Sequence, residues 1–168
     1  VRQDQMAILD ARRLAHQVVL PGHVVDVDLH HAEVRHRGGE MRAQGRKLDG
    51  SAWQVGIERP ADSPGAPGQL PRRVTLDDGA LATSGDYATP LTRDLSYNHL
   101  FDPHSGRSPA QLASVSIAAG SGMLADALST AVFVLGPEQG LERVRRTPSA
   151  DALWVLKTGR VLETPAFA

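Results

Sequence analysis

The sequence predicts an α+β fold, in which a mixed or mainly antiparallel sheet packs against a few helices. Several short segments alternate apolar and polar residues, as half-buried strands do. Residues 123–135 instead form a longer apolar segment with the composition of a helix. Strands and helices do not alternate regularly along the chain, which disfavours a doubly wound parallel sheet. The length of 168 residues fits one domain with a shared core.

The composition excludes several classes of function. With 18 basic and 19 acidic side chains the formal net charge is −1, so no overall field attracts nucleic acid or an anionic membrane surface. The chain has no cysteine, which excludes disulfides, thiolate metal sites and cysteine nucleophiles. No apolar run approaches the roughly 20 residues that span a bilayer, so we expect no transmembrane segment.

Residues 1–37 are a divergent N-terminal segment. The apolar residues of 6–20 fall at helical spacing, and Pro21-Gly22 ends that pattern. Residues 23–34 then alternate apolar and polar side chains, which predicts a strand.

Residues 38–168 are expected to form the functional region. It begins with Gly38 and Gly39, whose backbone can turn with positive φ or approach a ligand closely, and we take both as candidate cofactor contacts. Residues 53–57 alternate as a strand does. Residues 61–71 are rich in Pro, Gly and Ser and predict a surface loop.

The next segments predict more strands. Residues 74–76 and 80–84 flank Asp78-Gly79, a dipeptide suited to the turn of a β-hairpin. Residues 112–119 form a β-rich run.

The C-terminal part predicts helix followed by strand. A helix is expected from about Met123, ended by Gly136-Pro137, with a second short helix over residues 137–146. Residues 151–165 read as a strand, a turn at Thr158-Gly159 and another strand.

The predicted helix carries a carboxylate and a hydroxyl on one face. Asp126 and Thr130 are four residues apart, so their oxygens lie about one turn apart on a helix otherwise rich in Leu, Ala and Val. Such oxygens suit Mg²⁺, which takes its remaining ligands from water, carbonyls and phosphates. Alternatively, Asp126 lies in the first turn and only favours the positive end of the helix dipole. The spacing leaves both interpretations open.

The polar turn "NHLFDPHSG" at residues 98–106 is a second candidate site. His99 has the side chain that most readily exchanges a proton at neutral pH, so it could act as a general acid or base. Asp102 before a proline and Gly106 at the end of the turn also have ordinary structural uses.

Two other groups are open to simple interpretations. His30, His31 and His36 could bind zinc if the backbone brought them together. Ser84 lies in "TSGDY", which lacks the Gly-x-Ser-x-Gly pattern of a hydrolase elbow and fits a turn equally well.

The chain resembles the C-terminal half of the ApbE family of FAD:protein FMN transferases in six strings that occur in the family's order: "GGEMRAQG", "WQVGIERP", "LATSGDY", "HLFDPHSGRSP", "SVSIAAGSGMLADALSTAVFVLG" and "VLKTGRV". The resemblance implies part of an ApbE-like α+β fold. It also implies an enzyme that binds FAD with Mg²⁺, splits the diphosphate and transfers FMN to a Thr or Ser hydroxyl of an acceptor protein. Some relatives instead hydrolyse FAD to FMN and AMP.

The resemblance implies roles for individual residues. Asp126 and Thr130 match the family's side-chain metal ligands, and Ser129 stands where some relatives have a second acidic ligand. His99 matches the histidine that assists proton transfer from the accepting hydroxyl. The cofactor contacts implied are the backbone at Leu100 and Phe101, the loop residue Asp102, and the cleft-lining Ser84, Gly85 and Asp86.

The sequence departs from the family before Gly38, where the motif D-L-G-x-x-x-K-G-Y-A-x-D is expected and absent. We therefore expect a copy that is shortened or altered at its N-terminus. Two alternatives to a transferase stay open, namely a non-catalytic flavin-binding accessory protein and an inactive remnant. The resemblance implies a periplasmic location, free or membrane-anchored, with an acceptor in a membrane redox complex; the alternative location is cytoplasmic.

Overall fold

The computed structural model describes residues 7–8, 16–20, 23–27, 33–37, 39–47, 49–57, 60, 72–87 and 89–167, with side chains described from Gly39 onward. Along these residues the structure has one helix, α1 (Gly122–Arg145), between strands β9 and β10. In chain order the strands are β1 (Ala7–Ile8), β2 (His16–Leu20), β3 (His23–Val27), β4 (Glu33–Arg37), β5 (Glu40–Gln44), β6 (Trp53–Ile57), β7 (Arg72–Leu76), β8 (Ala80–Gly85), β9 (Leu112–Ala119), β10 (Ala150–Leu156) and β11 (Val161–Glu163).

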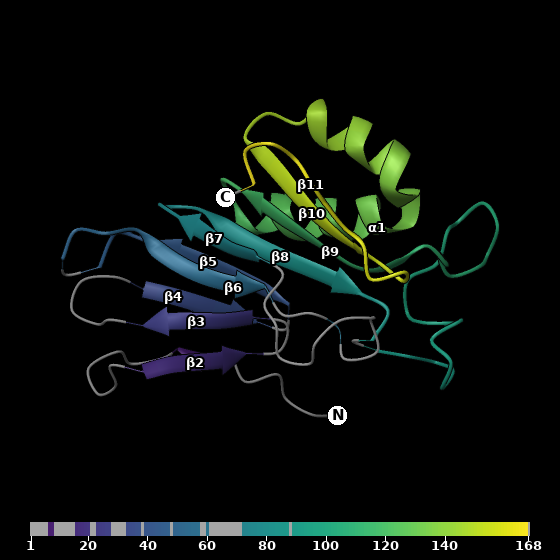
Figure 1. The fold of residues 1–168 in the computed structure, drawn as a ribbon, viewed down its shortest axis with the longest axis horizontal. Helices are drawn as coiled ribbons and strands as arrows, with labels where there is room; N and C mark the ends of the chain where they lie inside the picture. Colours follow the sequence, from purple (N-terminus) through teal and green to yellow (C-terminus); the bar gives the residue numbers. More distant parts are fainter. Residues whose placement is uncertain are drawn as a thin grey trace.

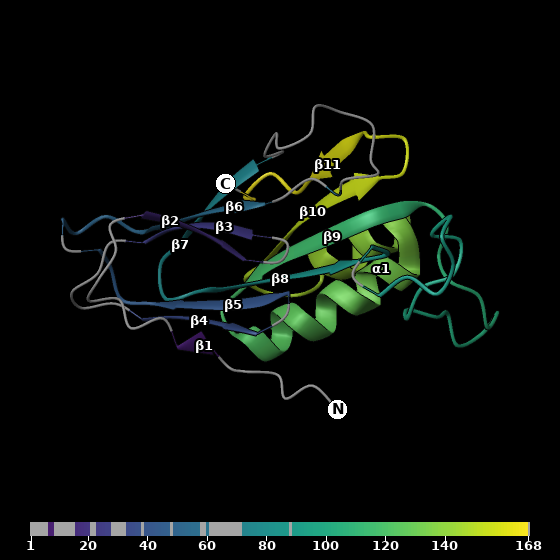
Figure 2. The same ribbon diagram turned by 90° about the horizontal axis from the view of Figure 1, so that it is seen from below.

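The described strands form two antiparallel sheets. The seven-stranded sheet has the order β1-β4-β5-β8-β9-β10-β11, and the four-stranded sheet the order β2-β3-β6-β7. Helix α1 covers the β8–β10 part of the seven-stranded sheet (Figure 1). The view from below shows three layers, with the four-stranded sheet on one face of the seven-stranded sheet and α1 on the other (Figure 2). This arrangement confirms the predicted α+β class.

One apolar cluster fills the space between the two sheets. Trp53, Val55 and Leu76 of the four-stranded sheet pack in the same cluster as Met41 and Leu81 of the seven-stranded sheet, and all five are buried. A residue pointing to this layer alternates along each strand with one pointing to the other face.

A second apolar cluster lies between the seven-stranded sheet and α1. The sheet contributes small and branched side chains such as Ala82 and Ile117, and the helix contributes Leu128, Val132 and Phe133. Ser84 continues the α1-facing row of β8 two residues after Ala82, so the sequence places a hydroxyl under the helix.

The predicted hairpin at Asp78-Gly79 is wrong. Strand β7 pairs with β6, whereas β8 pairs with β5 and β9, so the chain changes sheets at this turn. Asp78 has a φ of 52°, its carboxylate accepts from the N–H of Gly45 at 2.7 Å, and the carbonyl of Gly79 accepts from the N–H of Ala43 at 2.9 Å. These bonds to the end of β5 direct the chain into the other sheet. A local turn signal cannot distinguish the two arrangements.

The helical pattern of residues 6–20 is also wrong where the structure describes it. Ala7–Ile8 and His16–Leu20 are strands β1 and β2, and the valines of β2 pair with those of β3. Pairing with neighbouring strands outweighs weak helical spacing in this segment. The strand expected within residues 23–34 is β3. The predicted surface loop at 61–71 lies outside the described residues.

The predicted break at Gly136-Pro137 is confirmed. Helix α1 begins at Gly122, capped by the Ser121 hydroxyl, which accepts from the N–H of Leu124 at 3.3 Å. Gly136 has φ 78° and ψ 179° and divides α1 into two helical segments. A proline at the next position has no N–H to continue the helical hydrogen bonds, and glycine adopts this conformation without strain.

Strands β6, β9, β10 and β11 also match the segments predicted for them. No helix of the described residues is long and apolar enough to cross a membrane.

A methyl group at Gly39 should disrupt the β5–β8 contact. A Cβ added there would lie 2.5 Å from the backbone oxygen of Thr83, which cannot yield as a flexible side chain can. We expect Gly39→Ala to lower the free energy of unfolding by about 1–3 kcal/mol, the usual cost of overpacking. Urea unfolding measures this, with Gly120→Ala as the control because a Cβ there meets nothing within 4 Å. Equal unfolding midpoints for the two variants would contradict the packing argument.

Candidate functional site

Three hydroxyl groups meet where the end of β8 passes under α1. Ser84 Oγ lies 2.8 Å from Ser129 Oγ and 3.2 Å from Thr130 Oγ1. Ser129 Oγ also lies 2.9 Å from the carbonyl oxygen of Asp126, to which it donates. The structure thus brings together a residue of the "TSGDY" string and the polar residues of the helix, although they are 45 and 46 positions apart in sequence.

The direction of these hydrogen bonds follows from counting protons. Each hydroxyl has a single proton and two lone pairs. The proton of Ser129 is used on the carbonyl of Asp126, so Ser84 donates to Ser129, and Thr130 in turn donates to Ser84. This chain of donors turns the Thr130 proton toward the sheet and leaves lone pairs of its Oγ1 free for a cation.

Asp126 and Thr130 are both exposed on the first segment of α1. No acidic residue lies in the first turn of α1, so Asp126 is beyond the position that the dipole interpretation requires. An exposed carboxylate one turn from a hydroxyl with free lone pairs is a donor set that suits a hard cation such as Mg²⁺. Ser129 is buried, and its hydroxyl donates to Asp126 and accepts from Ser84, so its contacts support a bracing role rather than metal ligation.

No group of three or more His, Cys, Asp or Glu side chains gathers within the part of the chain that the structure describes. A site based on Asp126 and Thr130 therefore needs further oxygens from a substrate or from water. His30 and His31 lie outside the described residues, as does the side chain of His36, so the alternative zinc site is untested.

His99 lies on a small hairpin rather than on a simple turn. Its N–H donates to the carbonyl of Thr89 at 3.2 Å, and Pro90 and Asn98 form an isolated antiparallel bridge. The N–H groups of Leu91 and Thr92 both donate to the carbonyl of Tyr97, at 2.8 and 3.2 Å. The histidine side chain is exposed, so it can reach a bound molecule.

Buried polar contacts fix the backbone on either side of His99. Asn98 is fully buried, its Oδ1 accepts from the N–H of Leu100 at 2.9 Å, and its own backbone N–H and C=O both pair with Ser108 Oγ. Leu100 is buried, and Phe101 is 43% exposed. The N–H of Leu100 is thus occupied, and Phe101 offers the exposed apolar surface at this point.

The second half of the loop is an ordered turn around Asp102. Its carboxylate accepts from the N–H of His104 at 3.0 Å, and its carbonyl accepts from the N–H of Gly106 at 2.8 Å. The hydrogen bond from His104 is the largest cause that lowers the pKa of Asp102. These contacts support a loop-shaping role for Asp102.

No hydrogen bond among the described residues joins the Asp86 side chain to the hydroxyl cluster. Asp86 is buried, and its Oδ2 lies 3.1 Å from Lys157 Nζ without the alignment of a hydrogen bond. Burial raises the pKa of Asp86, and the nearby ammonium offsets part of that effect. Sequence reasoning missed Lys157 because nothing local in "KTG" points to a partner 71 positions away.

The glycine candidates have structural explanations in this fold. Gly39 lies against the backbone of Thr83, and a Cβ on Gly85 would lie 2.5 Å from the ring of Tyr87 and 3.0 Å from the carbonyl of Ala113. Gly38 lies outside the described residues. Close approach of protein atoms therefore accounts for Gly39 and Gly85 without a ligand.

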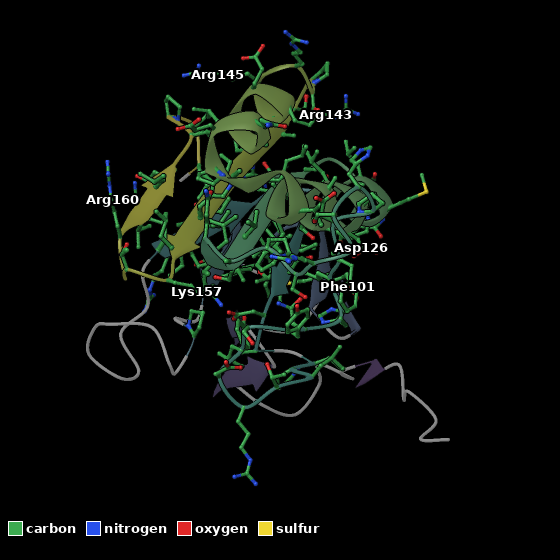
Figure 3. The ribbon with its side chains drawn as sticks, turned by 90° about the vertical axis from the view of Figure 1, so that its right-hand side faces the viewer. Phe101, Asp126, Arg143, Arg145, Lys157 and Arg160 are labelled. Atoms are coloured by element: carbon green, nitrogen blue, oxygen red, sulfur yellow. The ribbon has the colours of Figure 1, made fainter. Side chains whose placement is uncertain are left out.

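Viewed from the side that carries the hairpin, Phe101 and Asp126 project onto the same flank of the molecule, and Lys157 and Arg160 onto the other (Figure 3).

A sequence model described as "ApbE family" matches residues 29–154 of this chain. The chain belongs to the ApbE family.

ApbE proteins of known name are similar to the chain over part of their length. "FAD:protein FMN transferase" of Vibrio cholerae is 34% identical over 123 residues, 72% of this chain and 36% of the relative. The proteins of that name from Haemophilus influenzae and Treponema pallidum are 37% and 35% identical, over 62% and 86% of this chain and 30% and 37% of their own lengths. The chain thus spans about a third of the length of these curated relatives.

Solved ApbE structures share the fold. The ApbE protein of Thermotoga maritima matches with a TM-score of 0.70 and 32% identity, over 81% of this chain and 43% of that one. The apo flavinyl transferase ApbE of Pseudomonas stutzeri matches with a TM-score of 0.64 and 37% identity, over 84% and 43%. The family match begins at residue 29, whereas the sequence alone suggests residue 38 as the start of the functional region.

Removing the Ser84 hydroxyl should weaken the fold modestly. We expect Ser84→Ala to lower the free energy of unfolding by about 1 kcal/mol, the net worth of a typical hydrogen bond. The control is Ser114→Ala on β9, because Ser114 Oγ is buried without a hydrogen-bond partner among the described residues, and its loss should be neutral or stabilising. If urea unfolding showed that Ser114→Ala lowers the free energy of unfolding more than Ser84→Ala does, the hydroxyl cluster would not stabilise the fold as described.

The tip of the histidine hairpin should loosen in acid. Hydrogen bonds from the side chains of Thr92 and Ser96 lower the pKa of Asp94 from 3.8 to about 2. Because this pKa is lower in the folded state, its stabilisation is fully present above 3.8 and is lost as the pH falls through about 2. NMR should show the amides of Leu95 and Tyr97 shifting in that pH range, and Asp94→Asn should remove the titration. A shift centred at pH 3.8 would contradict the prediction.

Proposed function

We propose that this chain forms the C-terminal, cation-binding part of a Mg²⁺-dependent transferase that moves FMN from FAD to a Thr or Ser hydroxyl of an acceptor protein. The observation that carries the proposal is the geometry at Asp126 and Thr130, which present a carboxylate and a proton-free face of a hydroxyl from one exposed helix turn. The names of the relatives supply the substrate class.

The transfer breaks one bond of the FAD diphosphate. The acceptor hydroxyl oxygen forms a bond to the phosphorus of the FMN half, the bond from that phosphorus to the bridging oxygen breaks, and AMP leaves with the bridging oxygen. The hydroxyl proton must leave during the same step. Phosphoryl transfer of this kind depends mainly on positioning and on neutralising phosphate charge.

His99 is the residue we assign to that proton. Its side chain is exposed, and its backbone is fixed by the Thr89 carbonyl on one side and by Asn98 on the other. A fixed backbone limits the positions that the imidazole can reach, and a general base must lie within reach of the proton it takes. Phe101, two residues on, offers an apolar surface for the flavin ring.

Asp126 and Thr130 would hold the Mg²⁺, which when bound neutralises the diphosphate charge. The phosphate oxygens and water supply the ligands that the protein lacks, as is usual for this ion. Ser84 and Ser129 act indirectly by turning the Thr130 proton away.

The acceptor and the location follow from the family resemblance. We assign the chain to the periplasmic side of the membrane, where the acceptor would be a subunit of a membrane redox complex. An acceptor in the cytoplasm would overturn this part of the proposal and leave the chemistry intact.

A second candidate is a flavin-binding accessory protein without turnover. The observation that favours it is the sequence before Gly38, where the motif expected from the family resemblance is absent from residues 1–37. The rest of a flavin pocket would then come from elsewhere.

The two candidates are separated by incubating the full chain with FAD, Mg²⁺ and an acceptor domain. Transferase activity predicts AMP release and a fluorescent acceptor on a denaturing gel. We expect Asp126→Ala, or a chelator, to lower both signals at least about a hundredfold, because a phosphate-bridging cation supplies several kcal/mol. Glu138→Ala is the matched control, since it removes an exposed carboxylate from the second segment of α1.

The outcomes are distinct. FAD binding without AMP release would replace the transferase with the accessory role. Neither binding nor release would indicate an inactive remnant. Full activity in Asp126→Ala would remove the cation site from the mechanism.

A further inference from the structure

The segment between β8 and β9, residues 86–111, is long for a connection, and its described residues (86–87 and 89–111) form no helix or strand beyond the Pro90–Asn98 bridge. Loops of this length in a compact domain are uncommon and are often functional. This loop carries His99, so what holds it in place determines where the imidazole lies.

Successive backbone hydrogen bonds link the tip of the hairpin to His99. At the tip, the N–H of Leu95 donates to the carbonyl of Thr92 at 3.2 Å, and Leu95 has a φ of 56°. Toward the base follow the bonds from Leu91 and Thr92 to Tyr97, and then the bond from the N–H of His99 to Thr89. These bonds form a continuous series from the tip to the base of the hairpin, where His99 lies.

Lys157 holds the tip from a different part of the fold. It follows β10, and its backbone N–H donates to the carbonyl of Gln111 at 3.0 Å at the far end of the loop. Its ammonium donates to the carbonyl of Leu95 at 3.0 Å, across 62 positions of sequence. The same ammonium lies 3.1 Å from the carboxylate of Asp86 at the start of the loop. One side chain thus contacts the start and the tip of the loop, and its backbone contacts the end.

The burial of Asp86 strengthens its ion pair with Lys157. Asp86 is 2% exposed and Lys157 is 32% exposed, so water screens this pair less than it screens a surface pair. A buried carboxylate keeps its charge at a lower cost beside a cation, which holds the ammonium over the loop. In the side view Lys157 lies on the opposite flank from Phe101 and Asp126, away from the proposed site (Figure 3).

We propose that Lys157 is a positioning residue that clamps the hairpin tip through the Leu95 carbonyl and thereby fixes His99. Asp86 anchors the clamp through its ion pair with Lys157. This role deepens the proposed function and rests on it where catalysis is concerned, whereas the mechanical link can be tested without activity.

The test uses variants that separate the clamp from the buried charge. Lys157→Met alone leaves Asp86 buried without a cation and should destabilise the whole domain. The double variant Asp86→Asn/Lys157→Met removes both charges, so its unfolding midpoint should stay close to that of the unmodified chain while the clamp is absent. Arg160→Met is the matched control, because it removes an exposed cation from the same turn.

Amide hydrogen exchange measured by NMR on the full chain decides the mechanical claim. In the double variant, the amides of Leu91, Leu95 and His99 should exchange about tenfold faster, the effect of losing one hydrogen bond to a charged group. Amides in the middle of α1 should keep their rates, and Arg160→Met should change neither set. Unchanged hairpin rates in the double variant would overturn the inference.

Kinetics test the positioning role separately. If the unmodified chain releases AMP from FAD, the double variant should lower kcat about tenfold with a smaller change in KM for FAD, because Phe101 and the cation ligands remain and mainly the imidazole is misplaced. An unchanged kcat beside faster hairpin exchange would overturn the link from the clamp to catalysis. If the unmodified chain releases no AMP, the proposed function fails and the exchange experiment still decides the clamp.

Discussion

The hydrogen-bond chain from Thr130 through Ser84 and Ser129 to the carbonyl of Asp126 is the interaction on which the site depends. It crosses the interface between α1 and the seven-stranded sheet, where the second apolar cluster lies. Ser129 is buried and Ser84 partly buried, so their hydroxyls would be costly if unpaired, and the pairing links the helix to β8. The same bonds orient the exposed hydroxyl of Thr130.

The three layers explain why the hydroxyl cluster lies beside the two ends of the loop that bears His99. Strand β8 ends under α1, and the chain then leaves the sheet as the loop that bears His99 before it returns as β9. The antiparallel return places Val115 beside Ser84, so the loop starts and ends next to the hydroxyl cluster. Connections at the edge of a rigid scaffold are where binding residues are commonly found.

Local signals in the sequence predicted much of this fold. The break at Gly136-Pro137 and the alternation in β6 and β9 are encoded in neighbouring residues, as are the strands β10 and β11. The exchange of sheets at Asp78-Gly79 could not be predicted, because it depends on bonds from that turn to β5. For the site, the spacing of Asp126 and Thr130 was visible in sequence. The contact of Lys157 with Leu95 and the hydrogen bonds between Asn98 and Ser108 were not visible in sequence. They join polar groups that are distant along the chain or buried, and no local sequence pattern marks such pairs.

The central claim is that Asp126 and Thr130 bind a divalent cation together. Its most direct test is a crystal structure of the chain soaked with Mn²⁺ and FAD, with anomalous scattering to locate the metal. We expect an anomalous peak about 2.1–2.3 Å from both a carboxylate oxygen of Asp126 and Thr130 Oγ1, with diphosphate oxygens completing the shell. A peak bound elsewhere, or diphosphate held without a cation at these two side chains, would contradict the account.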